Sequence, residues 1–164
     1  MRWALPILVL ATVGCGPSSD HPILGAGPKA IEKFENATIT VYRLDPKGSP
    51  RNVTPGTPGY LHGWKILEEK VVDGADVRRQ ILQAITSRAN FGEDGAKCFD
   101  PGLGFRLVEG EIKSDFVICL DCYWVYCYLG PEEYLSSEGL TKAGRKELTD
   151  LYTSIFGAAP ARIY

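Results

Sequence analysis

The chain has 164 residues, with 18 basic and 20 acidic side chains and a formal net charge of −2 at neutral pH. This balance provides no basic excess for contacts with phosphates, so we expect no nucleic-acid partner. Hydrophobic residues make up 45% of the chain, and the length suits one domain with a substantial core.

The first fifteen residues have the layout of an export signal. Arg2 precedes an apolar run from Trp3 to Val13, and the small residue Gly14 is followed by Cys15. The run is far shorter than the roughly 20 residues of a membrane-spanning helix, and a basic start with an apolar middle is typical of a secretory signal. The pattern resembles the signals of bacterial lipoproteins, in which a cysteine after the cleavage site carries the lipid. An ordinary signal peptide cut nearby is the alternative.

The resemblance implies a signal peptide over 1–14 and a lipid, such as palmitate, on Cys15. The protein would then be anchored to a membrane of the cell envelope and face the periplasm. By resemblance to enterobacterial lipoproteins, Gly16 after the cysteine favours the outer membrane over the inner membrane. Glycines and prolines over 15–35 predict a flexible tether, with the folded body beginning near Phe34 and one domain over 36–164.

Two strands and a helix are expected in the first half of the domain. Residues 38–44 alternate and are rich in β-branched side chains, which predicts a strand. Prolines and glycines over 45–59 predict a long loop. The sequence of residues 63–72 predicts a second, less regular strand. A helix follows, with Asp73 as its N-cap. Its apolar stripe, with Leu82 beside it, is expected to contain Val77, Ile81, Ala84, Ile85 and Arg88.

The second half is expected to repeat this order of elements. A strand over 103–109, a turn at 110–111 and one long strand over 115–129 are predicted, followed by a solvated corner at Glu132 and Glu133. The last helix begins at the N-cap Thr141 and ends at Gly157. It is expected to bury Leu148, Leu151, Tyr152, Ile155 and Phe156. The order ββαββα predicts an α+β fold with a mainly antiparallel sheet and both helices on one face.

The predicted strand over 115–129 has two apolar faces. One face is expected to meet the helices and contains Phe116, Ile118, Leu120, Cys122, Trp124, Tyr126 and Tyr128. The other face, which includes Val117 and Tyr123, is too apolar for open water. We expect the loop over 45–59 to cover this outer face, with a protein partner as the alternative.

Four cysteines remain in the folded body once Cys15 is set aside, namely Cys98, Cys119, Cys122 and Cys127. An even number of cysteines in an exported chain predicts pairing. If the third and fourth strands form a tight hairpin, Cys98 lies opposite residues 122–127. A structural disulfide from Cys98 to Cys122 or Cys127 is therefore favoured.

Two chemical roles for the same four cysteines stay open. A CxxC motif in a thiol oxidoreductase opens a helix that stabilises the thiolate, whereas Cys119 and Cys122 lie in residues of strand composition. The four thiols could instead bind zinc, although no glycine or turn signal accompanies the CxxC. A Cys–His pair would need His62, which we expect at the surface. We predict no catalytic residue and no cofactor.

A resemblance appears in the same segment. Cys98-Phe99-Asp100-Pro101, Gly104-Phe105-Arg106 and the run from Asp115 to Cys122 resemble an uncharacterised family of bacterial proteins. The family pattern reads C-F-x-P-R-H-G-I-R and then V-D-L-V-I-C-F-E-C, and it implies no activity. Gly102 and Leu103 replace its Arg and His, while Cys127 is additional. The sequence thus predicts a binding or structural module of the envelope rather than an enzyme, with a thiol-redox or metal-binding protein as the alternative.

Overall fold

The computed structural model describes residues 32, 34–48, 53–54, 56–92, 98–130 and 133–160. The predicted signal peptide, Cys15 and the tether up to residue 31 lie outside the described residues, as does Glu132. The elements in chain order are β1 (Thr38–Leu44), β2 (Tyr60–Leu61), β3 (Trp64–Val71), α2 (Ala75–Thr86), the short 3-10 helix η1 (Arg88–Asn90), β4 (Leu103–Glu109), β5 (Ile112–Cys119), β6 (Trp124–Leu129), β7 (Glu133–Gly139) and α3 (Lys142–Phe156).

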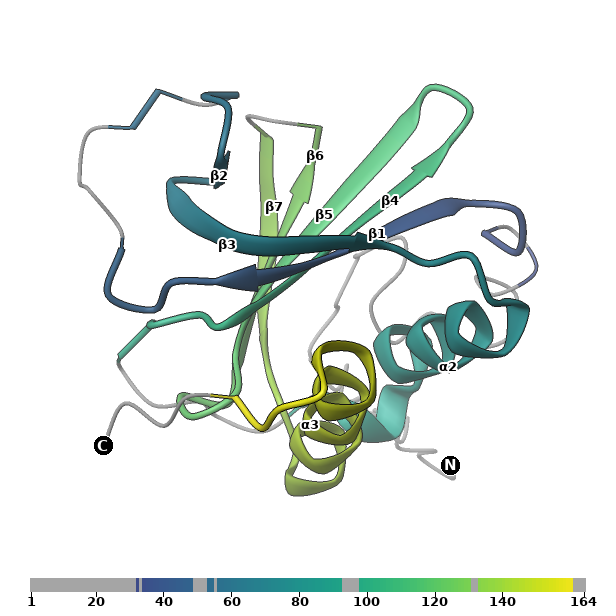
Figure 1. Ribbon diagram of the computed structural model, residues 1–164. Coiled ribbons are helices and arrows are strands. Elements are labelled where there is room, and N and C mark those ends of the chain that lie inside the picture. Colours follow the sequence, from purple (N-terminus) through teal and green to yellow (C-terminus); the bar gives the residue numbers. More distant parts are fainter. Residues whose placement is uncertain are drawn as a thin grey trace, which may run out of the picture.

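The strands form one curled sheet of seven strands in the order β2-β3-β1-β4-β5-β6-β7 (Figure 1). Every pair of neighbouring strands is antiparallel. The predicted class, α+β with an antiparallel sheet, is therefore confirmed, but the predicted order ββαββα is not. The short strand β2 and the polar strand β7 are additional, and the predicted strand over 115–129 is two strands.

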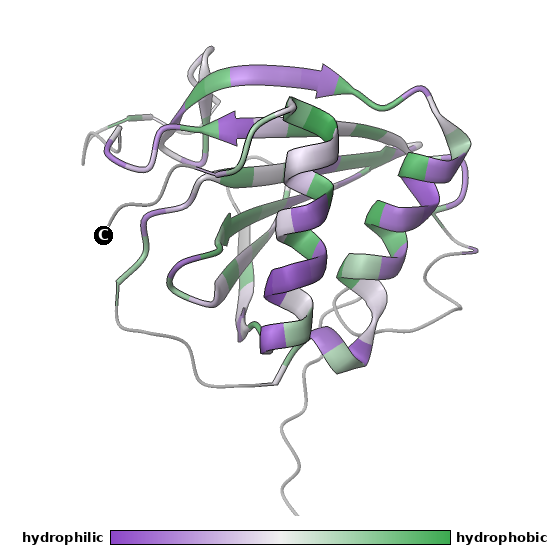
Figure 2. Cartoon of the chain, turned by 60° about the horizontal axis from the view of Figure 1, so that its bottom comes forward, coloured by the Kyte–Doolittle hydropathy of each residue, from purple (hydrophilic) through white to green (hydrophobic). Residues whose placement is uncertain are grey.

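Both helices lie side by side on one face of the sheet and turn their apolar stripes toward it (Figure 2). In α3, Thr141 Oγ1 accepts a hydrogen bond from the Gly144 N–H at 3.1 Å, and Gly157 ends the helix in the left-handed conformation with φ 72°. The predicted caps of this helix are thus confirmed. Its buried side chains include Leu148, Leu151 and Tyr152, while Ile155 and Phe156 are partly buried.

The first helix differs from its prediction at both ends. Its N-cap is Gly74 rather than Asp73, and no side chain caps it. The helix ends at Thr86, so Arg88 belongs to the following 3-10 turn and is exposed rather than part of the stripe. The apolar stripe itself is confirmed through Ile81, Leu82, Ala84 and Ile85, all buried.

The sheet is buried on both faces over its central strands. The main core lies between the sheet and the helices, and it includes Phe34 as well as Ile39 and Val41 of β1. A second cluster on the opposite face contains Tyr42, Leu44, Leu61 and Val117, with the partly buried Trp64, Ile66, Phe99 and Tyr128 packed against it. The chain itself therefore covers Val117 on the outer face, and this cover comes from Leu61 of β2 and from Phe99.

Candidate functional site

A hairpin turn between β5 and β6 forms the first part of the candidate site. Cys119 pairs with Trp124 across the hairpin, and four residues between them make the turn. Tyr123 closes the turn in the left-handed conformation with φ 55°, which a non-glycine residue adopts at an energetic cost. The prediction of one long strand over 115–129 is therefore wrong. Asp121 is the one turn-favouring residue between Cys119 and Trp124, and its neighbours have strand composition.

The turn also reverses part of the predicted pattern of faces. Phe116, Ile118 and Leu120 belong to the main core, as predicted. Beyond the turn, Val125 and Cys127 enter the main core, whereas Tyr128 packs against the second cluster and Tyr126 stacks on Phe99 at 3.9 Å between ring centroids. A turn changes the register of the side chains, so alternation counted through it assigns the later residues to the wrong face.

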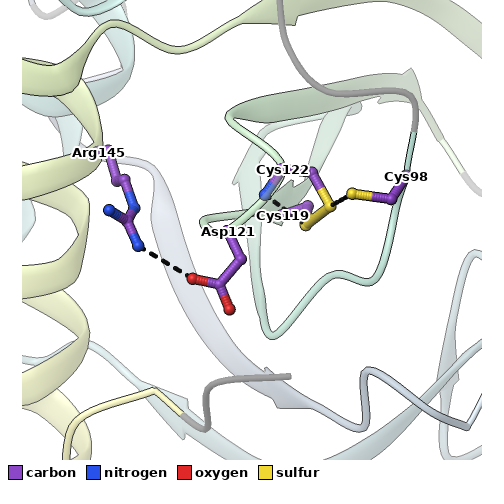
Figure 3. Close-up of a disulfide and its surroundings, with 5 residues drawn as sticks. All are labelled: Cys98, Cys119, Asp121, Cys122 and Arg145. Carbon is purple, nitrogen blue, oxygen red and sulfur yellow. Dashed lines mark hydrogen bonds and ion pairs between the residues drawn. A yellow bond between two sulfur atoms is a disulfide. The ribbon is translucent and has the colours of Figure 1, made fainter. Parts of the chain in front are cut away.

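Three sulfur atoms meet at this turn (Figure 3). Cys119 and Cys122 form a disulfide with a Cα–Cα distance of 5.2 Å. The Sγ of Cys98 lies 2.7 Å from the Sγ of Cys122. The side chains of the disulfide are fully buried, whereas Cys98 is partly exposed. The observed pairing differs from the expected pairing of Cys98 with Cys122 or Cys127, because a turn rather than an extended strand brings Cys119 and Cys122 together.

The backbone of the turn donates a hydrogen bond to one of these sulfurs. The N–H of Cys122 points at Cys119 Sγ over 3.1 Å. A donor in this position stabilises negative charge on the sulfur whenever the disulfide opens. In thiol oxidoreductases the N-terminus of a helix usually stabilises the thiolate, and the sequence predicts no helix here. The turn provides a single backbone N–H instead.

Arg145 of α3 holds the turn from the other side. Its Nη2 donates to Asp121 Oδ1 at 3.0 Å, and its Nη1 donates to the Tyr123 hydroxyl at 3.1 Å. Its guanidinium carbon also lies 4.9 Å from the centre of the Tyr123 ring, within the range of a cation–π contact. Because Asp121 and Tyr123 flank Cys122, these contacts attach the turn to α3. Figure 3 shows the pair of Arg145 and Asp121.

A solvent-open cleft of about 410 Å³ lies between the turn and α3. The turn contributes Asp121 and Tyr123 to its lining, and α3 contributes Lys142, Arg145 and Lys146. Acidic side chains at Asp100 and Asp150 also line it, so charges of both signs surround the opening. Apolar residues such as Leu120 and Pro160 line it as well, so the cleft suits a ligand or a partner segment that carries both charged and apolar groups.

Cys127 takes no part in the sulfur cluster. It lies on β6, fully buried in the main core, and burial raises the pKa of its thiol well above the ordinary value. A thiol in such surroundings is a packing residue of low reactivity. Cys127 therefore does not supply a fourth thiol beside Cys98, Cys119 and Cys122.

The described residues contain no group of three or more His, Cys, Asp or Glu side chains arranged to hold a metal ion. In the sulfur cluster itself, the Cys119–Cys122 bond uses two of the candidate ligands.

A second polar cluster lies on the outer face of the sheet around Asp115. Arg106 Nε and Nη2 donate to the two oxygens of this carboxylate, each at 2.7 Å, and His62 Nε2 lies 2.9 Å from Oδ2. Burial alone would raise the pKa of Asp115, but the hydrogen bonds from Arg106 and His62 outweigh it and hold the pKa below the usual value. The His62 ring stacks on Tyr128 with centroids 3.6 Å apart.

The prediction that His62 lies at the surface is wrong. Its side chain is 5% exposed. It pairs with Asp115 rather than with a cysteine. The residue sits between β2 and β3, so the pair fastens this connection to the sheet. The sequence contained no local signal for the pair, because 53 residues separate His62 from Asp115.

The residues that carry the sequence resemblance occupy the sites described above. Arg106 and Asp115 form the buried ion pair, and the three clustered cysteines come from the same motif. Gly104 lies beneath the outer cover, where a Cβ atom would come within 2.5 Å of Leu61 Cδ2. The motif residues therefore lie on the adjacent strands β4 and β5, in the segment before β4 and in the turn after β5.

Comparison with protein-family models, curated proteins and solved structures found no match to this chain. Among the described residues, no helix has both the length and the apolar character needed to cross a membrane.

Proposed function

We propose that this chain is a lipid-anchored protein of the bacterial cell envelope, whose domain serves as a binding or structural module. The anchor rests on the lipoprotein-like pattern of residues 1–15, with Cys15 as the lipidated residue and the outer membrane as the favoured location. Two or more acyl chains hold a protein stably on a membrane. Phe34 is buried in the main core although it lies within the predicted tether, so the folded domain includes residues before 36.

The mixed-charge cleft is the observation that carries the binding role. Lys142, Lys146 and Asp150 of α3 line the cleft, as do the hydrogen-bonded Arg145 and Tyr123. These groups can pair with charged and hydrogen-bonding atoms of a polar partner segment. A partner at the outer face of residues 115–129 is a second possible contact, and it would meet the half-buried Tyr126 rather than the covered Val117.

The anchor is tested by replacing Cys15 with serine in the full-length chain and following lipid incorporation and membrane fractionation. The Cys15→Ser protein should incorporate no labelled fatty acid, and it should be released from membranes or accumulate as a precursor. Cys98→Ser is the matched control, because it removes a cysteine of the domain and should leave membrane attachment unchanged. A wild-type protein that incorporates no lipid would refute the anchor.

The binding role is tested in the same membranes with a photo-crosslinking residue at Lys146, beside the cleft. A discrete adduct should form at Lys146 and be absent when the crosslinker replaces Arg79, which is exposed on α2. Adducts of the same size and yield at both positions would refute the cleft as a specific binding site.

A thiol–disulfide protein is the second candidate, and one observation favours it. The sulfur of Cys98, which is partly exposed, lies 2.7 Å from a sulfur of the buried disulfide. A structural disulfide needs no third sulfur beside it, whereas thiol–disulfide exchange proceeds by attack of a thiolate on a disulfide sulfur.

A further inference from the structure

We propose that Cys98, Cys119 and Cys122 form a disulfide relay, in which Cys122 exchanges its bond between the buried Cys119 and the partly exposed Cys98. This inference rests on the second candidate function, the thiol–disulfide protein, and gives that site a mechanism. The relay moves a disulfide from the interior of the hairpin to the protein surface, where a thiol of a partner can reach it.

The positions of the three sulfurs support Cys122 as the central residue. Its Sγ is bonded to Cys119 and lies 2.7 Å from Cys98 Sγ, so a bond to either neighbour requires little movement of Cys122. Arg145 holds the residues on both sides of Cys122 against α3. The turn around Cys122 is therefore held while the bonding partner of its sulfur changes.

The internal step needs no external oxidant or reductant. Cys98 loses its proton to water, and the thiolate attacks Cys122 Sγ. A Cys98–Cys122 bond forms as the Cys119–Cys122 bond breaks, and the bonding electron pair leaves on Cys119. The N–H of Cys122, 3.1 Å from Cys119 Sγ, stabilises this leaving thiolate until it takes up a proton. The number of disulfides and thiols is the same before and after the step.

The external step uses the thiols of a partner as the reductant. A partner thiolate attacks Cys98 Sγ, which forms a mixed disulfide and releases Cys122 as a thiolate. A second partner thiol then attacks the partner sulfur of the mixed disulfide and releases Cys98. The partner's two thiols are oxidised to one disulfide, and the cluster is reduced from one disulfide to three thiols. Direct attack on the original bond is hindered because Cys119 and Cys122 are fully buried.

The experiment compares full-length wild-type protein with Cys98→Ser and Cys119→Ser, and it uses reduced glutathione as the thiol probe. Each protein is acid-quenched, alkylated and mapped by peptide mass spectrometry. Cleavage before Asp121 separates Cys119 from Cys122. The modification state of Cys15 is determined from a separate peptide. Cys127→Ala is the matched control, because this residue is a cysteine outside the cluster. Circular dichroism and bound-metal analysis accompany every sample.

The relay predicts that Cys119→Ser contains a Cys98–Cys122 disulfide. It also predicts that glutathione reduces folded Cys98→Ser more slowly than wild type, by about tenfold or more, because its buried bond reacts only after local opening. Cys127→Ala should react at the wild-type rate. If Cys119→Ser fails to fold, the rate comparison between Cys98→Ser and wild type still decides.

Four results would overturn the relay. Equal reduction rates in wild type and Cys98→Ser would remove Cys98 from the path, while the thiol–disulfide function itself would stand. Free thiols at both Cys98 and Cys122 in folded Cys119→Ser would show that Cys122 does not change partners. No exchange with glutathione in any folded variant, or stoichiometric metal on three reduced thiols, would refute the thiol–disulfide function together with the relay.

Discussion

Asp115 is a carboxylate with no solvent exposure, and its charge is compensated by two side chains. Arg106 binds both of its oxygens in a bidentate arrangement, and His62 contacts one of them. A buried ion without such partners would be strongly disfavoured. The pair joins β4 to β5, and His62 adds the connection between β2 and β3, so one carboxylate ties together three parts of the sheet.

Replacing Asp115 with asparagine should destabilise the fold by about 3–5 kcal/mol at neutral pH, because it leaves a charged Arg106 without its partner. The loss should shrink in acid. The pKa of Asp115 is lowered in the folded state, so its contribution is present above the unfolded pKa of about 4 and is lost as the pH falls through the folded pKa. Urea unfolding at pH 7, 5 and 3 measures both effects.

Asp150→Asn is the control for this prediction, because Asp150 pairs with Lys146 on the exposed side of α3 and should change the unfolding midpoint little. Equal midpoint shifts for Asp115→Asn and Asp150→Asn, or a gap from wild type that stays constant from pH 7 to pH 3, would contradict the stabilising role of Asp115.

At the residue scale, the sequence pattern predicts which cysteines are candidates but not how they pair. The number and spacing of the cysteines predict Cys98, Cys119, Cys122 and Cys127 as candidates, whereas the structure brings the first three together and buries Cys127 in the main core. The pairing depends on Tyr123 adopting a left-handed conformation and on Arg145 binding beside it from another element. Such contacts link distant parts of the chain, and local pattern contains no information on them.

Two elements with strong local signals, α3 and β4, were predicted well. Thr141 and Gly157 bound α3 because a cap acts on the backbone within one turn. The strand over 103–109 was found with the observed ends because Leu103, Phe105 and Leu107 alternate and Gly110 follows as a turn residue. The strand β7 was missed because its sequence is polar, and its pairing with β6 rather than its own propensity places it in the sheet.

The apolar stripes of the two helices give a prediction at the element scale. Ile81→Asp on α2 and Leu148→Asp on α3 each place a charge at a position with 0% exposure. Each should cost several kcal/mol, because the core offers no compensating partner for a carboxylate. Thermal unfolding followed by circular dichroism measures the change.

Arg79→Asp is the control. Arg79 is exposed on α2, so this substitution reverses a charge without placing it in the core. Its melting temperature should stay near that of wild type. Similar melting temperatures in all three variants would show that the assigned stripes do not face the core.

At the scale of the whole molecule, the sheet separates two unequal clusters. The main core joins the sheet to both helices, whereas the second cluster is small and is closed by the chain around Leu61. The pattern of apolar residues predicts the α+β class, and it also predicts that the outer face of the sheet is covered. The curled seven-strand order was not, because β2 has two residues and pairs only with β3.

The small cluster should open independently of the main core. Leu61 is 1% exposed and packs over Gly104, so truncation to alanine removes the centre of the cover. In Leu61→Ala, hydrogen exchange should accelerate at the amides of Tyr60 and Ile66. The free energy of local opening is lower in this variant, because the contacts of the Leu61 side chain are already lost. Leu148→Ala lowers global stability through the main core and should leave exchange at these two amides unchanged. Equal acceleration in both variants would show that the cover unfolds only with the rest of the domain.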